Sequence, residues 1–345
     1  PRGGEAVYKT EGHPFVRSQN VGLGNLLLDD IAFIDEETHL RQKNTELQFN
    51  DVLLNITGAS IGRSALVDKQ IVGGNVNQHV CIIRTKENLV PSFICSFLLS
   101  NYGQRQIDSF QAGGNRQGLN FEQIKSIKIT IPSKDEQIKI AKLLRAIDER
   151  IATQNKIIDK LQSLIKGLRV CCMQRNGSNN VYLSEIAQIY QPQTISSAEL
   201  TEDGFLVYGA NGIIGKYKDY NHKTEQICIT CRGNTCGMVN YTKPMSWITG
   251  NAMVINTDKY QDKVYKKYLY HYLSAYNFNS IISGSGQPQI VRTPLEKLKI
   301  TLPTISEQKQ KAMILDKIQD KIEINHNILN LYILQKQYLL RQMFI

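Results

Sequence analysis

The most regular pattern in the sequence is an apolar stripe that recurs with alternating steps of four and three residues. Between residues 133 and 175 it consists of Ile140, Leu144, Ile147, Ile151, Gln154, Ile158, Leu161, Ile165, Leu168 and Cys172. A second stripe, between 304 and 345, consists of Leu315, Ile318, Ile322, Asn325, Leu329 and Tyr332. This period predicts two long helices that pack along their seams as a left-handed coiled coil.

Both helices begin with the same capping signal. Ser133-x-x-Glu136 follows one proline, and Thr304-x-x-Glu307 follows another. In such a capping box the hydroxyl and the carboxylate accept hydrogen bonds from backbone N–H groups that have no partner inside the helix. A heptad stripe can also form a zipper between two chains. Because this chain carries two equivalent helices, we favour a pair within one chain.

The residues outside these helices alternate short apolar runs with glycines, as in 51–57 and 226–231. Such runs are typical of strands and turns. One helical stretch is expected in each part, over 92–106 and 263–276, and the tyrosines at helical spacing in the second stretch (Tyr265, Tyr268, Tyr272 and Tyr276) are interpreted as core packing. We therefore predict two α/β domains, residues 1–132 and 176–303, separated by the helices at 133–175 and 304–345.

The two halves of the chain follow one plan and are related by a shift of 171 residues. Residues 124–132 align with 295–303, and the match continues through Glu136-Gln137 and Glu307-Gln308. Upstream the register drifts by a few residues, where Gly58–Gly62 resembles Gly233–Gly237 and Gly74-Asn75 resembles Gly250-Asn251. The fold is therefore predicted to be a pseudo-repeat, with the glycine-rich segments sharing either backbone geometry or function.

Composition narrows the class of protein without identifying it. The chain has 345 residues, 41% of them hydrophobic, and a formal net charge of +10. The largest share of the excess, ten basic minus five acidic residues, falls in 133–175. This charge is compatible with nucleic-acid binding but also with ordinary surface lysines. We expect a soluble, cytoplasmic protein with no membrane partner, whose seven cysteines are thiols.

The motifs of common catalytic and metal sites are missing from the sequence. There is no phosphate-binding loop, no His-Glu-x-x-His and no nucleophile elbow. Cys228-x-x-Cys231 with Cys236 suggests zinc, but no second pair follows at finger spacing, and small buried thiols in strands explain them as well. We expect no metal, no cofactor and no catalytic residue in this chain.

Taken together, these features resemble the specificity subunit of type I restriction-modification systems. The most specific matches are Ile129–Gln137 with Ile300–Gln308, supported by Pro14–Val21 and Tyr208–Gly215. The resemblance implies two target-recognition domains, each reading one half of a split double-stranded DNA sequence. It also implies an antiparallel coiled coil that acts as a ruler and docks two methyltransferase subunits. S-adenosylmethionine would then be bound by the methyltransferase, and restriction subunits would join the full complex.

The first copy departs from this pattern at its start. The second copy opens with residues 181–189, about 22 residues before Phe205, whereas the first copy reaches Phe15 almost at once. An opening strand or turn of the first domain is therefore expected to be missing from residues 1–132, and the sequence leaves the reason open.

Loops that read DNA need side chains able to pair with base edges and phosphates. Such side chains cluster in the glycine-rich loops of each copy. In the first copy the candidates are Arg17, Ser18, Asn20, Ser60, Arg63, Asn115, Arg116 and Gln117. In the second copy they are Tyr208, Asn211, Lys216, Arg232, Asn234, Thr235, Gln287, Gln289 and Arg292. The alternative for each one is an ordinary surface loop.

Two polar residues interrupt the seams at equivalent positions. Gln154 and Asn325 are separated by the repeat shift of 171 residues. In an antiparallel pair these amides would meet near the middle and set the register, as single buried polar residues do in other coiled coils. Alternatively, both side chains point to solvent or to a methyltransferase subunit.

Two other functions remain compatible with the sequence. A scaffold that separates two modules for glycans or proteins would also need a coiled coil, but its affinity for DNA would not fall steeply with salt. The recognition part of a larger methyltransferase is disfavoured, because no Asn-Pro-Pro-Tyr-like motif is present.

Overall fold

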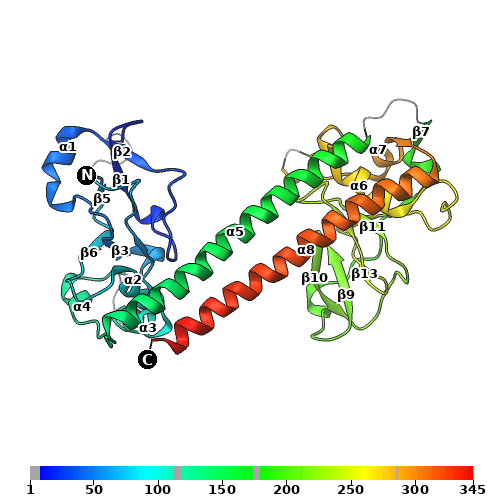
Figure 1. Cartoon of the computed structure of the whole chain (residues 1–345). Coiled ribbons are helices and arrows are strands. Elements are labelled where there is room, and N and C mark those ends of the chain that lie inside the picture. The colour runs from blue at the N-terminus through cyan, green and yellow to red at the C-terminus, as the bar shows by residue number, and fades with distance from the viewer. Residues whose placement is uncertain (1–7, 112–117, 174–178, 211, 285, 345) are drawn as a thin grey trace. The chain divides into compact units, whose positions relative to one another are not determined.

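The computed structural model describes residues 8–111, 118–173, 179–210, 212–284 and 286–344 (Figure 1). The chain divides into unit 1, residues 1–155 with 327–345, and unit 2, residues 156–326. Both long helices, α5 (Lys134–Met173) and α8 (Ile305–Gln342), contribute one half to each unit. The predicted class, two α/β domains combined with two long helices, is confirmed.

Unit 1 holds two small three-stranded sheets, ordered β2-β1-β5 and β4-β3-β6. Its strands are β1 (His13–Val16), β2 (Ala32–Ile34), β3 (Val52–Asn55), β4 (Ser64–Leu66), β5 (Asn75–Val76) and β6 (Val80–Ile83). Its short helices are α1 (Glu36–Arg41), α2 (Pro91–Leu99), α3 (Asn101–Ser109) and α4 (Phe121–Lys125). The expected single helix over 92–106 is wrong, because Ser100 interrupts it and accepts a hydrogen bond at the start of α3 from the Gly103 N–H.

Unit 2 holds sheets ordered β10-β9-β13, β12-β11-β14-β8 and β15-β7. Its strands are β7 (Asn179–Tyr182), β8 (Gln188–Tyr190), β9 (Phe205–Gly209), β10 (Gly212–Tyr217), β11 (Ile227–Thr230), β12 (Val239–Tyr241), β13 (Trp247–Ile248), β14 (Ala252–Asn256) and β15 (Lys299–Leu302). Helices α6 (Lys266–Ala275) and α7 (Arg292–Glu296) pack on them. The core-packing interpretation of the tyrosines is confirmed, because Tyr268 and Tyr272 are buried and Tyr265 and Tyr276 pack against the same cluster.

The predicted internal repeat is visible in the strand pairing. In unit 1, β1 pairs antiparallel with β2 and parallel with β5. In unit 2, β9 pairs antiparallel with β10 and parallel with β13. Likewise β3 is flanked by β4 and β6, as β11 is flanked by β12 and β14. Unit 2 adds β7 and β8, for which the described residues of unit 1 hold no counterpart.

Both predicted capping boxes are formed, and each is followed by a buried glutamine. The Ser133 N–H donates to Glu136 over 3.0 Å, and the Thr304 N–H donates to Glu307 over the same distance. Gln137 Oε1 accepts from Val90 N at 2.9 Å, where α2 begins, and its amide group donates to backbone carbonyls of Asn88 and Pro132. The capped turn thereby fixes the globular part of unit 1 to its long helix.

The same arrangement recurs in unit 2. Gln308 Oε1 accepts from Tyr265 N at 2.8 Å, where α6 begins, and Nε2 donates to the carbonyls of Lys263 and Pro303. Because neither glutamine is more than 1% exposed, each is committed to this structural role. The Glu-Gln pair of the repeat is thus a joint between helix and globule.

Within each unit the two helices run antiparallel, since positions further along α5 meet positions further back along α8. In unit 1 Lys336 Nζ lies 2.5 Å from Asp148 Oδ1, and Arg150 stacks over Tyr332. In unit 2 Arg169 donates to Gln319 over 3.4 Å and Lys311 donates to the Cys172 carbonyl. The expected seam residues pack together, as in the cluster Leu161, Ile165, Leu168, Leu315, Ile318 and Ile322. The pairing within one chain is therefore confirmed.

The two polar seam residues are both buried. Gln154, in unit 1, is 7% exposed, and Asn325, in unit 2, is 9% exposed. Neither side chain points to solvent, so that alternative is wrong. Asn325 Nδ2 donates to the Lys321 carbonyl of its own helix. The contact between the two amides stays a prediction.

Candidate nucleic-acid interface

Each unit builds the same glycine turn after its central strand. In unit 1 the Gly62 N–H donates to the Asn55 carbonyl at 3.0 Å, and in unit 2 the Gly237 N–H donates to the Thr230 carbonyl at 2.9 Å. Inner hydrogen bonds also match, from Ile61 N to Gly58 O and from Cys236 N to Gly233 O. The sequence similarity between these segments therefore reflects one shared backbone conformation.

Backbone conformation, rather than lack of space, explains the first glycine of each turn. Gly58 has φ of +73° and Gly233 has φ of +85°, values that other residues rarely adopt. An added Cβ would meet nothing within 4 Å at either position. The turns are consequently open on their outer side, where another molecule can approach the backbone.

A second loop crosses the base of each turn. In unit 1 Thr57 forms a bridge with Gly118, and in unit 2 Arg232 forms a bridge with Gln289. Candidate loops far apart in the sequence thus form one surface in each unit. Asn115, Arg116 and Gln117 precede the bridge of unit 1 and lie outside the described residues, as does Asn211 of unit 2.

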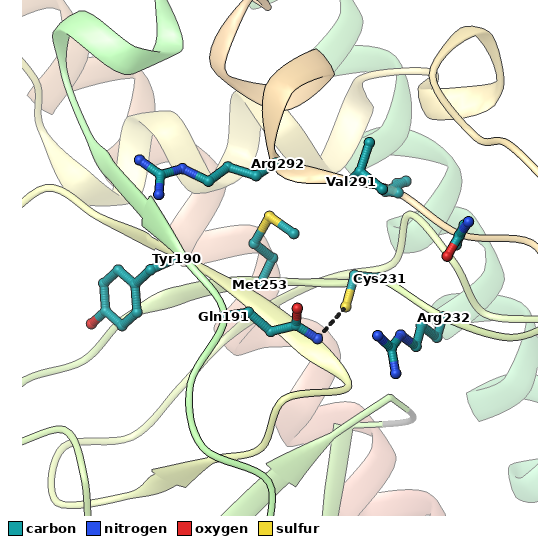
Figure 2. A pocket seen from close by; sticks show the side chains of 9 residues that line it. Tyr190, Gln191, Cys231, Arg232, Met253, Val291 and Arg292 are labelled. Carbon is teal, nitrogen blue, oxygen red and sulfur yellow. Dashed lines mark hydrogen bonds between the residues drawn. The ribbon is translucent and has the colours of Figure 1, made fainter.

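In unit 2 the crossing borders a pocket of about 380 Å³ (Figure 2). Candidate residues Arg232, Gln289 and Arg292 line it together with Tyr190 and Gln191. Figure 2 shows the two guanidinium groups on either side of Met253. Three of the predicted side chains are therefore brought together.

The charged groups at this surface differ in how much they are already engaged. Arg232 is exposed, and its guanidinium makes no hydrogen bond or ion pair with other residues that the structure describes. Arg292 Nε lies 2.6 Å from Glu296 Oε1, and Lys216 Nζ lies 3.5 Å from Asp203 Oδ1. Both ion pairs are substantially exposed and weak. Asn234 and Gln287 are exposed. Of Arg232, Arg292 and Lys216, Arg232 is accordingly the one most available to a ligand.

Two other candidates in unit 2, Tyr208 and Thr235, use their hydroxyl groups in hydrogen bonds within the unit. Tyr208 is only 5% exposed, and its hydroxyl accepts a hydrogen bond from Lys243 N at 3.1 Å. Thr235 Oγ1 donates to the Ala210 carbonyl at 3.1 Å, beside a similar bond from Thr230. Tyr208 packs in the core, and Thr235 holds the tip of the β9–β10 hairpin against the glycine turn.

Unit 1 requires a similar correction around Arg17. Its guanidinium donates to the Asp30 carbonyl at 2.5 Å and to the Asp30 carboxylate at 3.2 Å, and it stacks over Tyr8. Asn20 is fully buried and donates to the Leu27 carbonyl and to Asp30. The Ser18 carbonyl accepts from Asn55 Nδ2 at 2.7 Å. These three residues hold the loop after β1 in place, so direct base contacts by Arg17 and Asn20 are no longer expected.

Arg63 and Ser60 remain at the surface of the unit 1 turn. Arg63 is exposed, and the structure gives its side chain no partner among the described residues. Ser60 is half-buried, and its carbonyl accepts from Arg63 N at 3.1 Å. Arg63 is thus an available cation at the turn of unit 1, as Arg232 is at the turn of unit 2.

The sequence contained no sign of Gln191, and it left open whether Cys228 and Cys231 are buried thiols or zinc ligands. Gln191 Nε2 donates to the Gly250 carbonyl and lies 3.9 Å from Cys231 Sγ, but no motif marks it. Burial raises the pKa of Cys228 to about 12, as expected for an inert core thiol.

Within the described ranges no group of three or more His, Cys, Asp or Glu side chains could hold a metal. No helix built from these residues is long and apolar enough to cross a membrane.

The chain thus contains two copies of one α/β plan, and each copy presents polar loops. Comparison with known proteins gives the class a name: the family model of the type I restriction modification DNA specificity domain matches residues 7–163 and 176–331. The chain therefore belongs to the type I restriction-modification DNA specificity family.

Individual relatives agree with this assignment. The putative type I restriction enzyme MjaX specificity subunit of Methanocaldococcus jannaschii is 24% identical, over 91% of this chain and 82% of the relative. The EcoprrI specificity subunit of Escherichia coli is 32% identical over 39% of this chain and 34% of its own length. The fold is similar to the solved S subunit from M. genitalium, with a TM-score of 0.67 and 17% identity over 99% of this chain and 91% of that one.

Proposed function

We propose that each unit reads one half of an asymmetric, bipartite sequence in double-stranded DNA. Equivalent backbone positions carry different side chains: Arg232 stands where unit 1 has Thr57, and Met238 stands where unit 1 has Arg63. The same turn would thus present different hydrogen-bonding groups to DNA in each unit. This difference on a shared backbone is the observation that carries the proposal.

Arg232 is proposed to contact a base edge in the half-site of unit 2. An arginine can donate two parallel hydrogen bonds to guanine, and Gln289 beside it could do the same to adenine. Asn234, Gln287, Arg292 and Lys216 would contribute contacts to bases or phosphates. In unit 1 Arg63 takes the corresponding role, with Ser60 and the predicted Asn115, Arg116 and Gln117.

The test compares the methylation pattern of DNA in cells that carry the complete system with either wild-type or variant chain. Arg232→Ala should relax one position of one half-site, at a cost of about 1–3 kcal/mol in discrimination. Arg63→Ala should relax the other half-site only. Arg17→Lys serves as the control, because the Arg17 side chain is bonded to Asp30 within unit 1. Uniform weakening at all sequences would identify Arg232 and Arg63 as phosphate contacts, and a continuous or palindromic motif would refute the two-reader proposal.

We further propose that one methyltransferase subunit docks on the helix pair of each unit. In unit 1 the side of α8 turned away from the seam exposes Leu331, Leu334 and Tyr338, each at least 60% exposed. In unit 2 α5 exposes Ile157 and Leu164, which are seven residues apart. Lines of exposed apolar residues on a helix are typical of surfaces that bind a partner.

The double variant Leu331→Glu with Leu334→Glu should weaken assembly with the methyltransferase by tenfold or more, because two carboxylates would be desolvated at the interface. Gln337→Glu, at an exposed position of α8 outside this line, is the matched control. Sedimentation of the purified complex measures the stoichiometry. Equal assembly by the double variant and the control would exclude this face as the dock.

The remaining roles follow from this proposal. The paired helices would act as a ruler that sets the spacer between half-sites. The chain itself would hold no cofactor and perform no catalysis, with S-adenosylmethionine bound by the methyltransferase and restriction subunits joining later in the cytoplasm. The purified chain should therefore transfer no labelled methyl group to DNA until the methyltransferase is added.

A further inference from the structure

In both units the loop that crosses the glycine turn leads into a short helix, α4 in unit 1 and α7 in unit 2. In unit 1 Leu119 N donates to the Ile56 carbonyl at 2.8 Å, and in unit 2 Ile290 N donates to the Cys231 carbonyl at 3.0 Å. Leu119 is 5% exposed and Ile290 is 3% exposed, so both belong to the core. The residues that follow them are therefore held at equivalent places by the same backbone bond.

These following residues are the N-caps of the two helices, Asn120 in unit 1 and Val291 in unit 2. Their backbones agree closely, with φ of −95° and −102° and ψ of 165° and 164°. Asn120 accepts a hydrogen bond from Gln123 N at 2.8 Å, as N-cap side chains commonly do. The counterpart of Gln123 in unit 2 is Pro294, which has no N–H to donate. The capping role that occupies Asn120 is therefore absent at Val291.

Val291 is not part of the core either. Its side chain is 46% exposed, although the preceding Ile290 is buried. Neither packing nor capping thus accounts for an aliphatic residue at this position. The β-branched side chain of valine is restricted in its rotation, so it loses little conformational entropy when a ligand covers it.

The surroundings of Val291 are positively charged. It lines the pocket of about 380 Å³ together with Arg232 and Arg292, and Figure 2 shows it next to Arg292. The described residues that line this pocket include these two arginines and no carboxylate. The other aliphatic and sulfur-containing side chains of the lining are at most 4% exposed, namely Cys231, Met253 and Ile290. Val291 therefore offers an aliphatic surface beside cations that attract a polyanion such as DNA.

We infer that Val291 recognises the C5-methyl group of a thymine in the half-site of unit 2. The inference rests on the DNA readout proposed above. Base pairs present hydrogen-bond donors and acceptors in the major groove, and the thymine methyl is the one apolar group among them. An aliphatic side chain beside Arg232 therefore distinguishes a feature of the base pair for which neither arginine is a partner.

The pocket also limits where this thymine lies. Val291 and Arg232 line the same small pocket, and successive base pairs are separated by a rise of about 3.4 Å. The thymine should therefore lie within about two base pairs of the position that Arg232 reads.

The test uses duplexes in which single thymines are replaced by uracil, which lacks only the methyl group. The target sequence comes from the methylation pattern, and Arg232→Ala identifies the half-site of unit 2. The complex of the wild-type chain with its methyltransferase should bind one of the uracil duplexes about fourfold more weakly, as expected for the loss of one buried methyl group. The complex with Val291→Asn should bind that duplex and the thymine duplex about equally.

Asparagine is a suitable replacement, because Asn120 has the same backbone conformation in unit 1. Urea unfolding should give nearly equal midpoints for Val291→Asn and wild type, since position 291 is exposed. Val72→Asn, at a valine of unit 1 that is 45% exposed, is the matched control and should keep the fourfold difference.

Several outcomes would overturn the inference. Among them are equal sensitivity to uracil in wild type and Val291→Asn, a half-site of unit 2 without an A·T pair, and uniform weakening of all duplexes by Val291→Asn, which would indicate a contact with the DNA backbone. If Arg232→Ala relaxes a position and uracil has no effect, the inference alone fails. If neither change has an effect, the readout by unit 2 fails together with it.

Discussion

Gln308 offers the most direct test of how each unit is joined to its long helix. Its side chain is fully buried and makes three hydrogen bonds to backbone groups, of 2.8 Å with Tyr265 N, 3.1 Å with Lys263 O and 2.9 Å with Pro303 O. Methionine has a similar length and shape but replaces none of these bonds. Gln308→Met therefore removes the polar contacts while it preserves the packing.

The expected loss follows from the three backbone groups left without a partner. A buried donor or acceptor without a partner costs about 1–3 kcal/mol, and omitting the amide saves its own desolvation, so the net loss is about 3–5 kcal/mol. That is a large part of the stability of an ordinary domain. Gln310→Met, at an exposed position of the same helix, should change stability by no more than about 0.5 kcal/mol.

Urea unfolding measures both variants through the fluorescence of Trp247, the single tryptophan of the chain, which lies in β13 of unit 2. The midpoint should fall for Gln308→Met and stay in place for Gln310→Met. Equal midpoints would refute the reasoning, because they would show that the buried amide contributes nothing beyond its volume.

Three further predictions concern stability and register. Burial lowers the pKa of His271, whose Nδ1 accepts from Arg169 and whose Nε2 bonds to Asp316. Below about pH 6.5, the pKa of histidine in the unfolded chain, the unfolded chain takes up a proton more readily than the folded one. Unit 2 should therefore lose stability as the pH falls below this value. Urea midpoints at pH 7.5 and 5.5 should differ less for His271→Asn than for wild type, and the exposed control His326→Asn should behave as wild type. Gly233→Ala should cost about 1–2 kcal/mol because φ is +85°, whereas Gly167→Ala, inside α5 and also in open space, should not lower stability when thermal unfolding is compared. Leucine at both Gln154 and Asn325 should raise the melting temperature and broaden the range of spacer lengths between methylated half-sites. An unchanged range would show that these amides do not set the register.

Features that depend on neighbouring residues in the sequence were predicted well. The capping boxes at Ser133 and Thr304 and the seams of α5 and α8 follow from local spacing, and the structure contains them. The helix over 92–106 failed because Ser100 offers its hydroxyl as a cap, which competes with continuing the helix. Local periodicity alone does not register that competition.

Features that depend on distant partners were beyond the sequence. Arg17 and Arg232 look alike as arginines in polar loops, yet only Arg17 meets a carboxylate, that of Asp30. The residues before Tyr208 are apolar and do not indicate which face of the strand is buried. In the structure Tyr208 is buried in the core. Choosing among candidate contact residues therefore requires knowing which polar groups are already satisfied within the fold.

The two units show which parts of the repeat are needed for folding and which are available for recognition. Gln137 and Gln308 make equivalent bonds, and Gly58 and Gly233 share a backbone conformation, so these residues are tied to the plan itself. Thr57 and Arg232 occupy equivalent positions in the two units. Both residues form the same backbone bridge, although their side chains differ. Because the bridge is held by backbone groups, this position can change its side chain without loss of the fold. If each unit reads a half-site as proposed, a different specificity can therefore arise at such positions while the joint to the helices stays the same.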